Sequence, residues 1–177
     1  MTIHTRDACL KDANCLARIS VEGWQDSYAD IIDQGTLDSL SITKKTEDWV
    51  AILNTTTQTI VAEDHKNIVG FISFGPSHDT GYGQGEVYAL YVSGSHQRRG
   101  IGQMLMSKAM AIMSKQNLLP VIAIALKGNV PAETFYRNQG FSIKDMIISV
   151  INEKPYEEII CKSPDTKPLL TANTTQT

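Results

Sequence analysis

The sequence is poor in residues that bind metals or form disulfide bonds. Its 177 residues include three cysteines and four histidines. The cysteines, Cys9, Cys15 and Cys161, show no Cys-x-x-Cys spacing and the histidines are scattered, so nothing indicates a zinc site. We therefore expect no bound metal, and we expect reduced, partly buried thiols in a cytoplasmic protein.

Membrane proteins and nucleic-acid-binding proteins are also disfavoured. No segment approaches the run of about 18 apolar residues that a membrane-spanning helix needs. The N-terminus lacks the basic-then-apolar pattern of a secretion signal. The net charge of −3 disfavours a nucleic-acid surface, which usually needs a basic stripe. We expect neither a membrane nor a nucleic acid as a partner.

The length suits one domain with a sizeable core, which we place at residues 1–163. Residues 164–177 are rich in threonine, proline and asparagine, and this composition predicts a disordered tail. We found no internal repeat.

Apolar spacing predicts the elements of the first half. Residues 3–5 form a short strand, and helices are expected at 12–24, within 27–41 and at 43–53. Residues 59–63 and 68–74 flank a tight turn, which predicts two antiparallel strands. The glycine-rich segment 75–85 is expected to be a mobile loop.

The second half alternates strands and helices. Strands are expected at 86–92 and 121–126, helices at 101–113 and 132–138, and two closing strands at 141–151 and 157–162. Hairpins in the first half of the sequence and an αβ unit in the second half predict an α/β fold with a mixed sheet and helices on both faces.

The most informative motif lies between the predicted strand 86–92 and the helix that follows it. It reads Gln97-Arg98-Arg99-Gly100-Ile101-Gly102-Gln103. Glycines let backbone N–H groups approach an anion, and a helix N-terminus favours negative charge, so the motif indicates a pyrophosphate site. A turn that merely connects strand and helix is the alternative.

Two common nucleotide-binding loops fit this turn poorly. No Gly-Lys-Ser/Thr follows, which excludes a Walker loop. The third glycine of a dinucleotide fingerprint is missing, and strand 121–126 is apolar throughout and does not end on an acidic residue.

A second motif, Asn129-x-x-Ala132-x-x-Phe135-Tyr136-x-x-x-Gly140-Phe141, follows the next predicted strand. Together the two motifs resemble the GNAT (Gcn5-related N-acetyltransferase) superfamily, whose turn is Gln/Arg-x-x-Gly-x-Gly/Ala. Residues 68–71 and 90–92 are similar to the family's third and fourth strands, and residues 22–29 to the first-helix region of many bacterial members. The resemblance covers residues 3–162, nearly the whole chain.

The resemblance implies a central, mostly antiparallel sheet in which parallel strands 4 and 5 splay apart around acetyl-CoA. Unpaired backbone groups of the splayed strands would bind the pantetheine arm. The implied donor-binding residues are Leu90, Tyr91, Val92, Gln97, Arg98, Arg99, Gly100, Ile101, Gly102, Gln103, Asn129 and Tyr136. The arginine side chains could equally be solvated, and Asn129 could simply form a turn.

The resemblance also implies acetyl transfer to an amine by direct attack in a ternary complex. Tyr136 is the candidate proton donor to the departing thiolate; the alternative is an aromatic pair with Phe135 on a core helix. Glu86 is the candidate base, acting directly or through water; the alternative is an exposed strand-end carboxylate. Glu63 and Asp79 are weaker candidates for the base.

The acceptor side is less well defined. Trp24 and Tyr28 lie four residues apart on one helical face, and Tyr88 shares a strand face with Glu86. In the family that the motifs resemble, acceptor contacts come mainly from the first helices and the last hairpin. The resemblance therefore implies these three residues, Asp30, the segment 75–85 and Tyr156 as candidates to line the acceptor pocket, although Trp24 and Tyr88 could be core residues.

Three functions fit the motifs. The first is N-acetylation of a small-molecule amine. The second is acetylation of a protein N-terminus or lysine, which an open acceptor groove would favour. The third is a non-catalytic acyl-CoA sensor, against which the intact Glu86 and Tyr136 argue. The motifs leave open the acceptor, the acyl-chain preference and whether the chain forms a homodimer.

Overall fold

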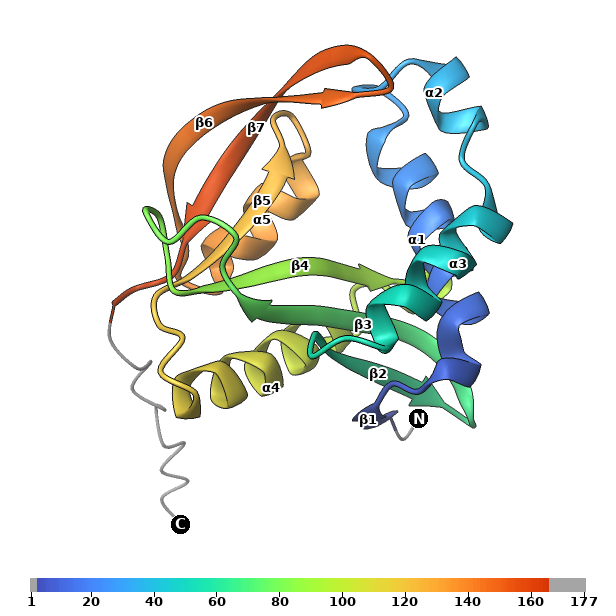
Figure 1. The fold of residues 1–177 in the computed structure, drawn as a ribbon, viewed down its shortest axis with the longest axis horizontal. Coiled ribbons are helices and arrows are strands. Elements are labelled where there is room, and N and C mark those ends of the chain that lie inside the picture. The colour runs from blue at the N-terminus through green and yellow to red at the C-terminus, as the bar shows by residue number, and fades with distance from the viewer. Residues whose placement is uncertain (1–2, 166–177) are drawn as a thin grey trace.

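Seven segments rich in branched apolar residues form one sheet in the computed structural model, which describes residues 3–165 (Figure 1). The strand order is β1-β2-β3-β4-β5-β7-β6. Every neighbouring pair is antiparallel except β4 and β5, which are parallel. The predicted mixed α/β sheet, mostly antiparallel with parallel strands 4 and 5, is confirmed.

The helices and strands have the following bounds: β1 Ile3–Asp7, α1 Ala13–Tyr28, α2 Gln34–Asp38, α3 Ile42–Leu53, β2 Gln58–Asp64, β3 Asn67–Pro76, β4 Gly85–Val92, α4 Ile101–Lys115, β5 Val121–Leu126, α5 Val130–Asn138, β6 Ser142–Ile151 and β7 Lys154–Lys162. Short 3-10 turns lie at Leu10–Asp12 and Gly94–His96.

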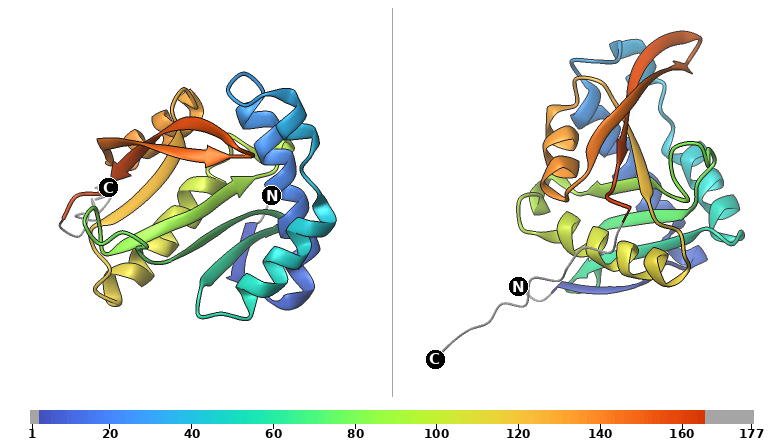
Figure 2. Two further views of the ribbon diagram at one scale, coloured as in Figure 1. Left: turned by 45° about the horizontal axis from the view of Figure 1, so that its top comes forward. Right: turned by 90° about the vertical axis from the view of Figure 1, so that its left-hand side faces the viewer.

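Helices cover both faces of the sheet, as the sequence predicted. One core lies between the sheet and α4 and α5, and includes Leu105, Met106 and Met113 of α4. The second core joins α1 and α3 to the other face, with Trp49 of α3 against Phe71 of β3. Figure 2 shows α1 and α3 on one side of the strands and α4 on the other.

A third, smaller cluster joins elements that are far apart in the sequence. It gathers Leu37 of α2, Leu126 at the end of β5 and Tyr156 of β7. In Figure 1 the β6–β7 hairpin extends away from the rest of the sheet and reaches α2 at its tip. This contact joins α2 to the end of β5 and to β7.

Several predicted boundaries were wrong by a few residues. Helix α5 begins at Val130 because the Asn129 side chain caps it, accepting a hydrogen bond from the Ala132 N–H at 3.1 Å. Strand β7 begins at Lys154 because the hairpin turn is short, with Asn152 and Glu153 in left-handed conformations.

Other sequence-based expectations also need correction. The predicted loop 75–85 is shorter than expected, because its end residues pair in β3 and β4. Cys9 is exposed rather than partly buried. Residues 166–177, most of the predicted disordered tail, lie outside the described part of the chain. Within residues 3–165 no helix combines the length and the apolar character that crossing a membrane requires.

Candidate active site

The turn between β4 and α4 has the geometry of an anion site. Gly100 takes a left-handed conformation, with φ of 79°, just before α4 begins at Ile101. A Cβ added to Gly100 would meet no atom within 4 Å, so the space beside this backbone is open. The free N–H groups of the first helical turn point toward this end of α4.

The rest of the turn holds this geometry in place. Gln97 donates a hydrogen bond from Nε2 to the carbonyl of Val92 at 3.2 Å, which ties the turn to the end of β4. A Cβ at Gly102 would lie 3.3 Å from the Phe135 ring, so this glycine allows α4 to pack closely on α5. Arg98, Arg99 and Gln103 are exposed at the turn.

Strands β4 and β5 separate beside this turn. Their parallel pairing is limited to the partners Gly85–Val121, Glu86–Ile122 and Val87–Ala123. The other edge of β4 continues to pair with β3 as far as Val92. The stretch of β4 after Val87 therefore presents backbone N–H and C=O groups to the gap rather than to β5.

A β-bulge in β4 marks the point of separation. Ser73 and Phe74 are consecutive in β3, yet they pair with Ala89 and Val87, so Tyr88 is the extra residue. Beyond the bulge, Leu90 and Val92 pack on the core formed with α4, and Tyr91 packs on the opposite face. The cofactor-binding segment predicted at residues 90–92 thus lies on the splayed edge.

Tyr136 of α5 is buried beside the gap. It is 8% exposed and lies between the rings of Phe135 and Phe141, with centroids 5.5 and 5.7 Å away. Burial, reinforced by the neighbouring Tyr28 and Cys161, raises the pKa of Tyr136, which keeps its phenol protonated at neutral pH. Among residues 3–165 no partner accepts a hydrogen bond from its hydroxyl.

Two further tyrosines converge on the same gap. Burial raises the pKa of Tyr28, while the Asn129 side chain lowers it and the Glu158 carboxylate raises it. Burial raises the pKa of Tyr91 well above its usual range, and the nearby Tyr28 adds to this effect. The cluster of Tyr28, Tyr91 and Tyr136 therefore offers neutral hydroxyl groups from α1, β4 and α5.

Glu86 is a buried carboxylate, not the exposed strand-end group that was the alternative. It is 9% exposed, and its Oε2 accepts a hydrogen bond from the His78 backbone N–H at 2.9 Å. The His78 ring Nδ1 lies 3.1 Å from the same oxygen. Tyr88 lies beside this pair, with its ring centroid 4.8 Å from that of His78.

The two weaker candidates for the base are engaged elsewhere. Glu63 of β2 forms an ion pair with Arg6 at 2.7 Å. Asp79 is exposed and accepts a hydrogen bond from the Gly81 N–H within the β3–β4 loop.

Trp24 and Tyr28 are the predicted acceptor residues of α1, and Tyr28 belongs to the cluster of tyrosines. The rings of Trp24 and Tyr28 meet edge to face at 5.1 Å, which confirms that they share one helical face. Both are half-buried against the cluster formed with Leu126 and Tyr156. Asp30, by contrast, is exposed just after the end of α1.

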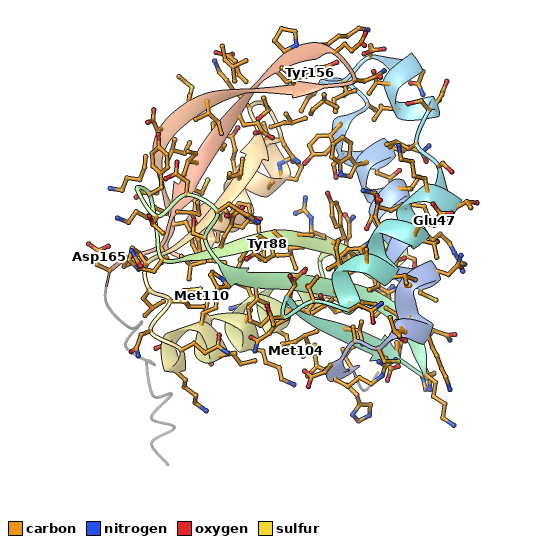
Figure 3. All side chains as sticks on the ribbon, viewed as in Figure 1. Glu47, Tyr88, Met104, Met110, Tyr156 and Asp165 are labelled. Carbon is orange, nitrogen blue, oxygen red and sulfur yellow. The ribbon has the colours of Figure 1, made fainter. Side chains whose placement is uncertain are left out.

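Side chains at the tip of the β6–β7 hairpin contact side chains of α2. Asp33, the N-cap of α2, forms an ion pair with Lys154 at 2.9 Å and accepts a hydrogen bond from the Tyr156 hydroxyl at 3.1 Å. Asn152 donates to the hydroxyl of Thr36 at 3.2 Å. Figure 3 labels Tyr156 in this hairpin and Tyr88 on β4 below it. We call this set of contacts the roof.

Glu158 lies on β7 beneath the roof. It is half-buried and accepts a short hydrogen bond from Ser149 of β6. Alternation along β7 places Tyr156 and Glu158 on one face, and Tyr156 contacts the cluster that includes Tyr28. This half-buried carboxylate was not identified from the sequence.

Sequence analysis also missed His78, Asp33 and Lys154. Asp33 could have been found as an N-cap residue before α2, since Asp is favoured there. Glu158 could have been found from its spacing to Tyr156. His78 carries no local signal, because its role depends on a loop that folds back onto Glu86.

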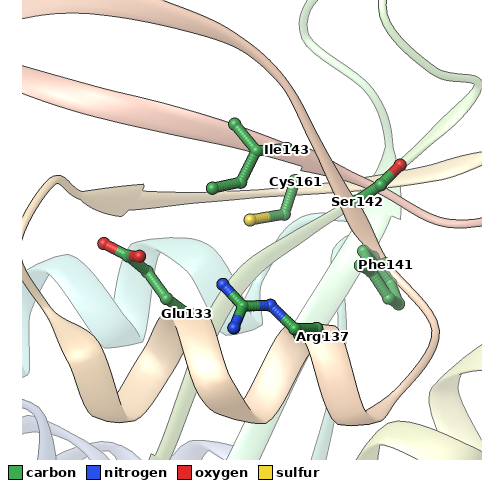
Figure 4. A pocket seen from close by; sticks show the side chains of 6 residues that line it. All are labelled: Glu133, Arg137, Phe141, Ser142, Ile143 and Cys161. Carbon is green, nitrogen blue, oxygen red and sulfur yellow. The ribbon is translucent and has the colours of Figure 1, made fainter.

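A separate pocket of about 240 Å³ lies between α5 and the strands β6 and β7 (Figure 4). In Figure 4, Cys161 of β7 faces Glu133 and Arg137 of α5. None of the predicted site residues lines this pocket.

These features define a class of protein: an α/β protein with a gap between two splayed parallel strands and a glycine turn at a helix N-terminus at one end of that gap. The sequence profile of the acetyltransferase (GNAT) family matches residues 21–141. The chain belongs to this family, and it is an N-acetyltransferase.

Similar proteins agree with this assignment. An uncharacterized N-acetyltransferase of Bacillus subtilis (strain 168), YuaI, is 30% identical over 76% of this chain and 78% of its own length. A spermidine N(1)-acetyltransferase of Thermoplasma acidophilum is 25% identical over 89% of this chain and 99% of its own.

Solved structures share the fold. The PaiA N-acetyltransferase of T. acidophilum, in complex with coenzyme A, matches 89% of this chain and 98% of its own with a TM-score of 0.70 and 22% identity. A GCN5-related N-acetyltransferase of Rhodopseudomonas palustris matches 92% and 96% with a TM-score of 0.77 and 20% identity.

Proposed function

We propose that the protein transfers the acetyl group of acetyl-CoA to a primary amine of a small molecule by direct attack in a ternary complex. Acetyl-CoA is the donor substrate in this proposal. Three features fit it: the open space at Gly100, the unpaired edge of β4 and the available hydroxyl of Tyr136. The structure of a relative in complex with coenzyme A supports the same donor.

The donor would lie along β4. Its pyrophosphate would bind the N–H groups at the start of α4, and its arm would run back along the edge from Val92 toward Tyr88. At about 3.3 Å per residue, this path is about 13 Å long. The reacting thioester would then lie at the bulge, between Glu86 and Tyr136.

Tyr136 would assist the leaving group. Its phenol stays protonated because burial raises its pKa, so it can donate a hydrogen bond to the sulfur as the carbon–sulfur bond breaks. Burial also raises the pKa of Cys161, and a thiol kept protonated is a poor nucleophile, which favours direct transfer to the amine over an acyl-enzyme.

The amine must lose a proton before it attacks. An alkylamine has a pKa near 10, so about one molecule in a thousand is neutral at pH 7. That population corresponds to roughly 4 kcal/mol that a positioned base must offset. Glu86 is the carboxylate at the point where β4 and β5 separate, so it is the proposed centre of this step.

The roof is the observation that favours a small acceptor. The contacts of Asp33 with Lys154 and Tyr156 join α2 to the β6–β7 hairpin, and this junction would leave less room for a peptide chain than for a small amine. Acetylation of a protein N-terminus or lysine, the second candidate, needs an open groove. The non-catalytic sensor, the third candidate, would have no use for Glu86 and Tyr136.

A panel of amines tests this function. The purified protein is mixed with acetyl-CoA and polyamines, amino acids, aminoglycosides or peptides, and thiol release is followed. We expect release with a small amine, and we expect Tyr136→Phe to lower kcat by roughly 10- to 100-fold while acetyl-CoA still binds. Release with peptides alone would favour the second candidate, and release with no amine would favour the sensor.

A further inference from the structure

The β3–β4 loop places an imidazole on the buried carboxylate of the site. His78 contacts Glu86 twice, through its backbone N–H at 2.9 Å and through ring Nδ1 at 3.1 Å, and both contacts reach the same oxygen, Oε2. One of these contacts would be enough for a residue that only covers the carboxylate from solvent. The double contact fixes the ring as well as the loop.

The orientation of the ring determines which nitrogen is available. A carboxylate beside Nδ1 keeps a proton on that nitrogen, so the neutral ring carries its lone pair on Nε2. Nε2 is directed away from Glu86, and the His78 side chain is 77% exposed. The arrangement therefore leaves a basic nitrogen accessible from solvent beside Glu86.

Tyr88 holds the ring from the other side. Its ring lies 4.8 Å from that of His78, and its hydroxyl donates a short hydrogen bond to the carbonyl of Pro76 in the same segment. A Cβ at Gly75 would lie only 2.8 Å from this hydroxyl, so a larger residue there would displace the Tyr88 ring. The bulge that separates β4 from β5 thus also supports the imidazole.

The pair lies on the face of the sheet that α1 covers. Phe71 packs against α1, and alternation along β3 places Gly75 on the same face. Tyr88 lies over Gly75, so the His78 ring stacked on it belongs to this face as well. Trp24 and Tyr28 of α1, the predicted acceptor residues, approach the sheet from this side.

We propose that His78 is the catalytic residue that takes the proton from the acceptor amine, and that Glu86 is a positioning residue acting through it. This inference rests on the proposed function and specifies its proton-transfer step. The ionisable groups around the imidazole are Glu86 and Tyr88 on β4 and Asp79 in the same loop.

The proton balance is as follows. His78 Nε2 takes one proton from the ammonium group and passes it to water, which its exposure allows. The neutral nitrogen then forms a bond to the thioester carbon, the carbon–sulfur bond breaks, and the nitrogen loses its second proton. The departing thiolate gains one proton, so the reaction releases one proton overall. Glu86 stabilises the imidazolium while it is charged.

Replacement of His78 by asparagine separates this role from simple capping. The side-chain amide of the His78→Asn variant can still donate to Glu86, but it cannot take up a proton at neutral pH. We expect His78→Asn to bind acetyl-CoA normally, to lose about 100-fold in kcat/KM for the amine and to show a pH–rate profile of different shape from that of the wild type. We expect added imidazole to restore part of the activity of His78→Ala.

His65→Asn is the matched control. His65 is an exposed histidine whose ring also lies beside a buried carboxylate, Asp64, but in the β2–β3 turn. The control substitution should leave the rate and its pH profile unchanged. Wild-type activity and pH profile in His78→Asn would overturn the inference and leave the proposed function intact.

Two further observations complete the test. The ring proton on Nδ1 should be visible by NMR in the wild type and should exchange faster in Glu86→Gln, a result that does not depend on turnover. Absence of thiol release by the wild type with every amine would overturn the proposed function itself, and the inference with it.

Discussion

The two sides of the gap between β4 and β5 are built in different ways. The side proposed to bind the donor consists mainly of backbone: the left-handed Gly100, the N–H groups that open α4 and the unpaired edge of β4. The acceptor side consists of side chains from α1, α2, the β3–β4 loop and β7. Its contacts join distant residues, such as Asp33 and Tyr156, which lie 123 positions apart.

This difference has a functional meaning. A backbone site recognises groups common to all substrates of one donor class and tolerates changes in most side chains. A side-chain site can change its specificity through single substitutions. The comparison therefore predicts that substitutions on the donor side weaken acetyl-CoA binding whichever amine is used, whereas substitutions in the roof change which amine is preferred.

The largest effect is expected on the donor side. Gly100→Val forces a β-branched residue into a left-handed conformation and fills the open space beside the backbone. We expect the affinity for acetyl-CoA, measured by calorimetry, to fall at least about tenfold, since one lost contact of about 1.4 kcal/mol already gives that factor.

Gly140→Val provides the matched control for this change. Gly140 also has a positive φ, 84°, and no atom within 4 Å of an added Cβ, but it follows α5 rather than preceding α4. It should lower stability similarly and leave donor affinity nearly unchanged. Equal loss of donor affinity in both variants would contradict the assignment of the anion site to Gly100.

An intermediate effect is expected on the acceptor side. Asp33→Ala removes the ion pair with Lys154 and the hydrogen bond from Tyr156 that close the roof. We expect KM for the amine to rise severalfold, with larger amines gaining relative to small ones, while acetyl-CoA affinity stays the same. Asp38→Ala, at the other end of α2, serves as the control. A narrower range of amines accepted by Asp33→Ala would contradict the prediction that the roof limits the size of the acceptor.

The smallest effect is expected when the charge of Asp33 in the roof is removed without changing its size. The Lys154 ammonium lowers the pKa of Asp33 below its ordinary value of 3.8, and Asp33 raises the pKa of Lys154 above 10.5. The stability that ionised Asp33 contributes is present above pH 3.8, and it is lost only as the pH falls through its lowered pKa. The contribution of Lys154 is present below pH 10.5 and is lost only as the pH rises through its raised pKa.

The ion pair should therefore remain intact throughout the range in which the enzyme can be assayed. Asp33→Asn should shift the rate equally at all pH values between about 5 and 9, without changing the shape of the profile. A changed shape would show that the roof, and not only His78, contributes to the pH dependence.

The glycine turn before α4 and the splayed strands could be predicted, because the signals of the turn are local. Gly100 and Gly102 occur in the turn itself, and the splay follows from the family resemblance that the motifs carry. The helices and strands were found because apolar periodicity of about 3.6 or 2 residues survives in one sequence. The errors fell at ends, such as Asn129 before α5, where a single side-chain hydrogen bond decides the boundary.

The acceptor side could be predicted only in part. Trp24 and Tyr28 were proposed because the resemblance implies acceptor contacts from the first helices, and Glu86 because members of the family often carry a base at this place. Their surroundings were not predicted: burial of Glu86 depends on a loop that returns with His78.

The sequence by itself determined the family, the alternation of helices and strands and the position of the donor turn, because each depends on residues within a few positions of one another. Only the tertiary structure decided which charged groups meet on the acceptor side. There, His78 reaches Glu86, and Asp33 reaches Lys154 and Tyr156. The physical reason is that an exposed loop and the tip of a hairpin carry no periodic pattern, so their partners are set by how the sheet brings distant segments together.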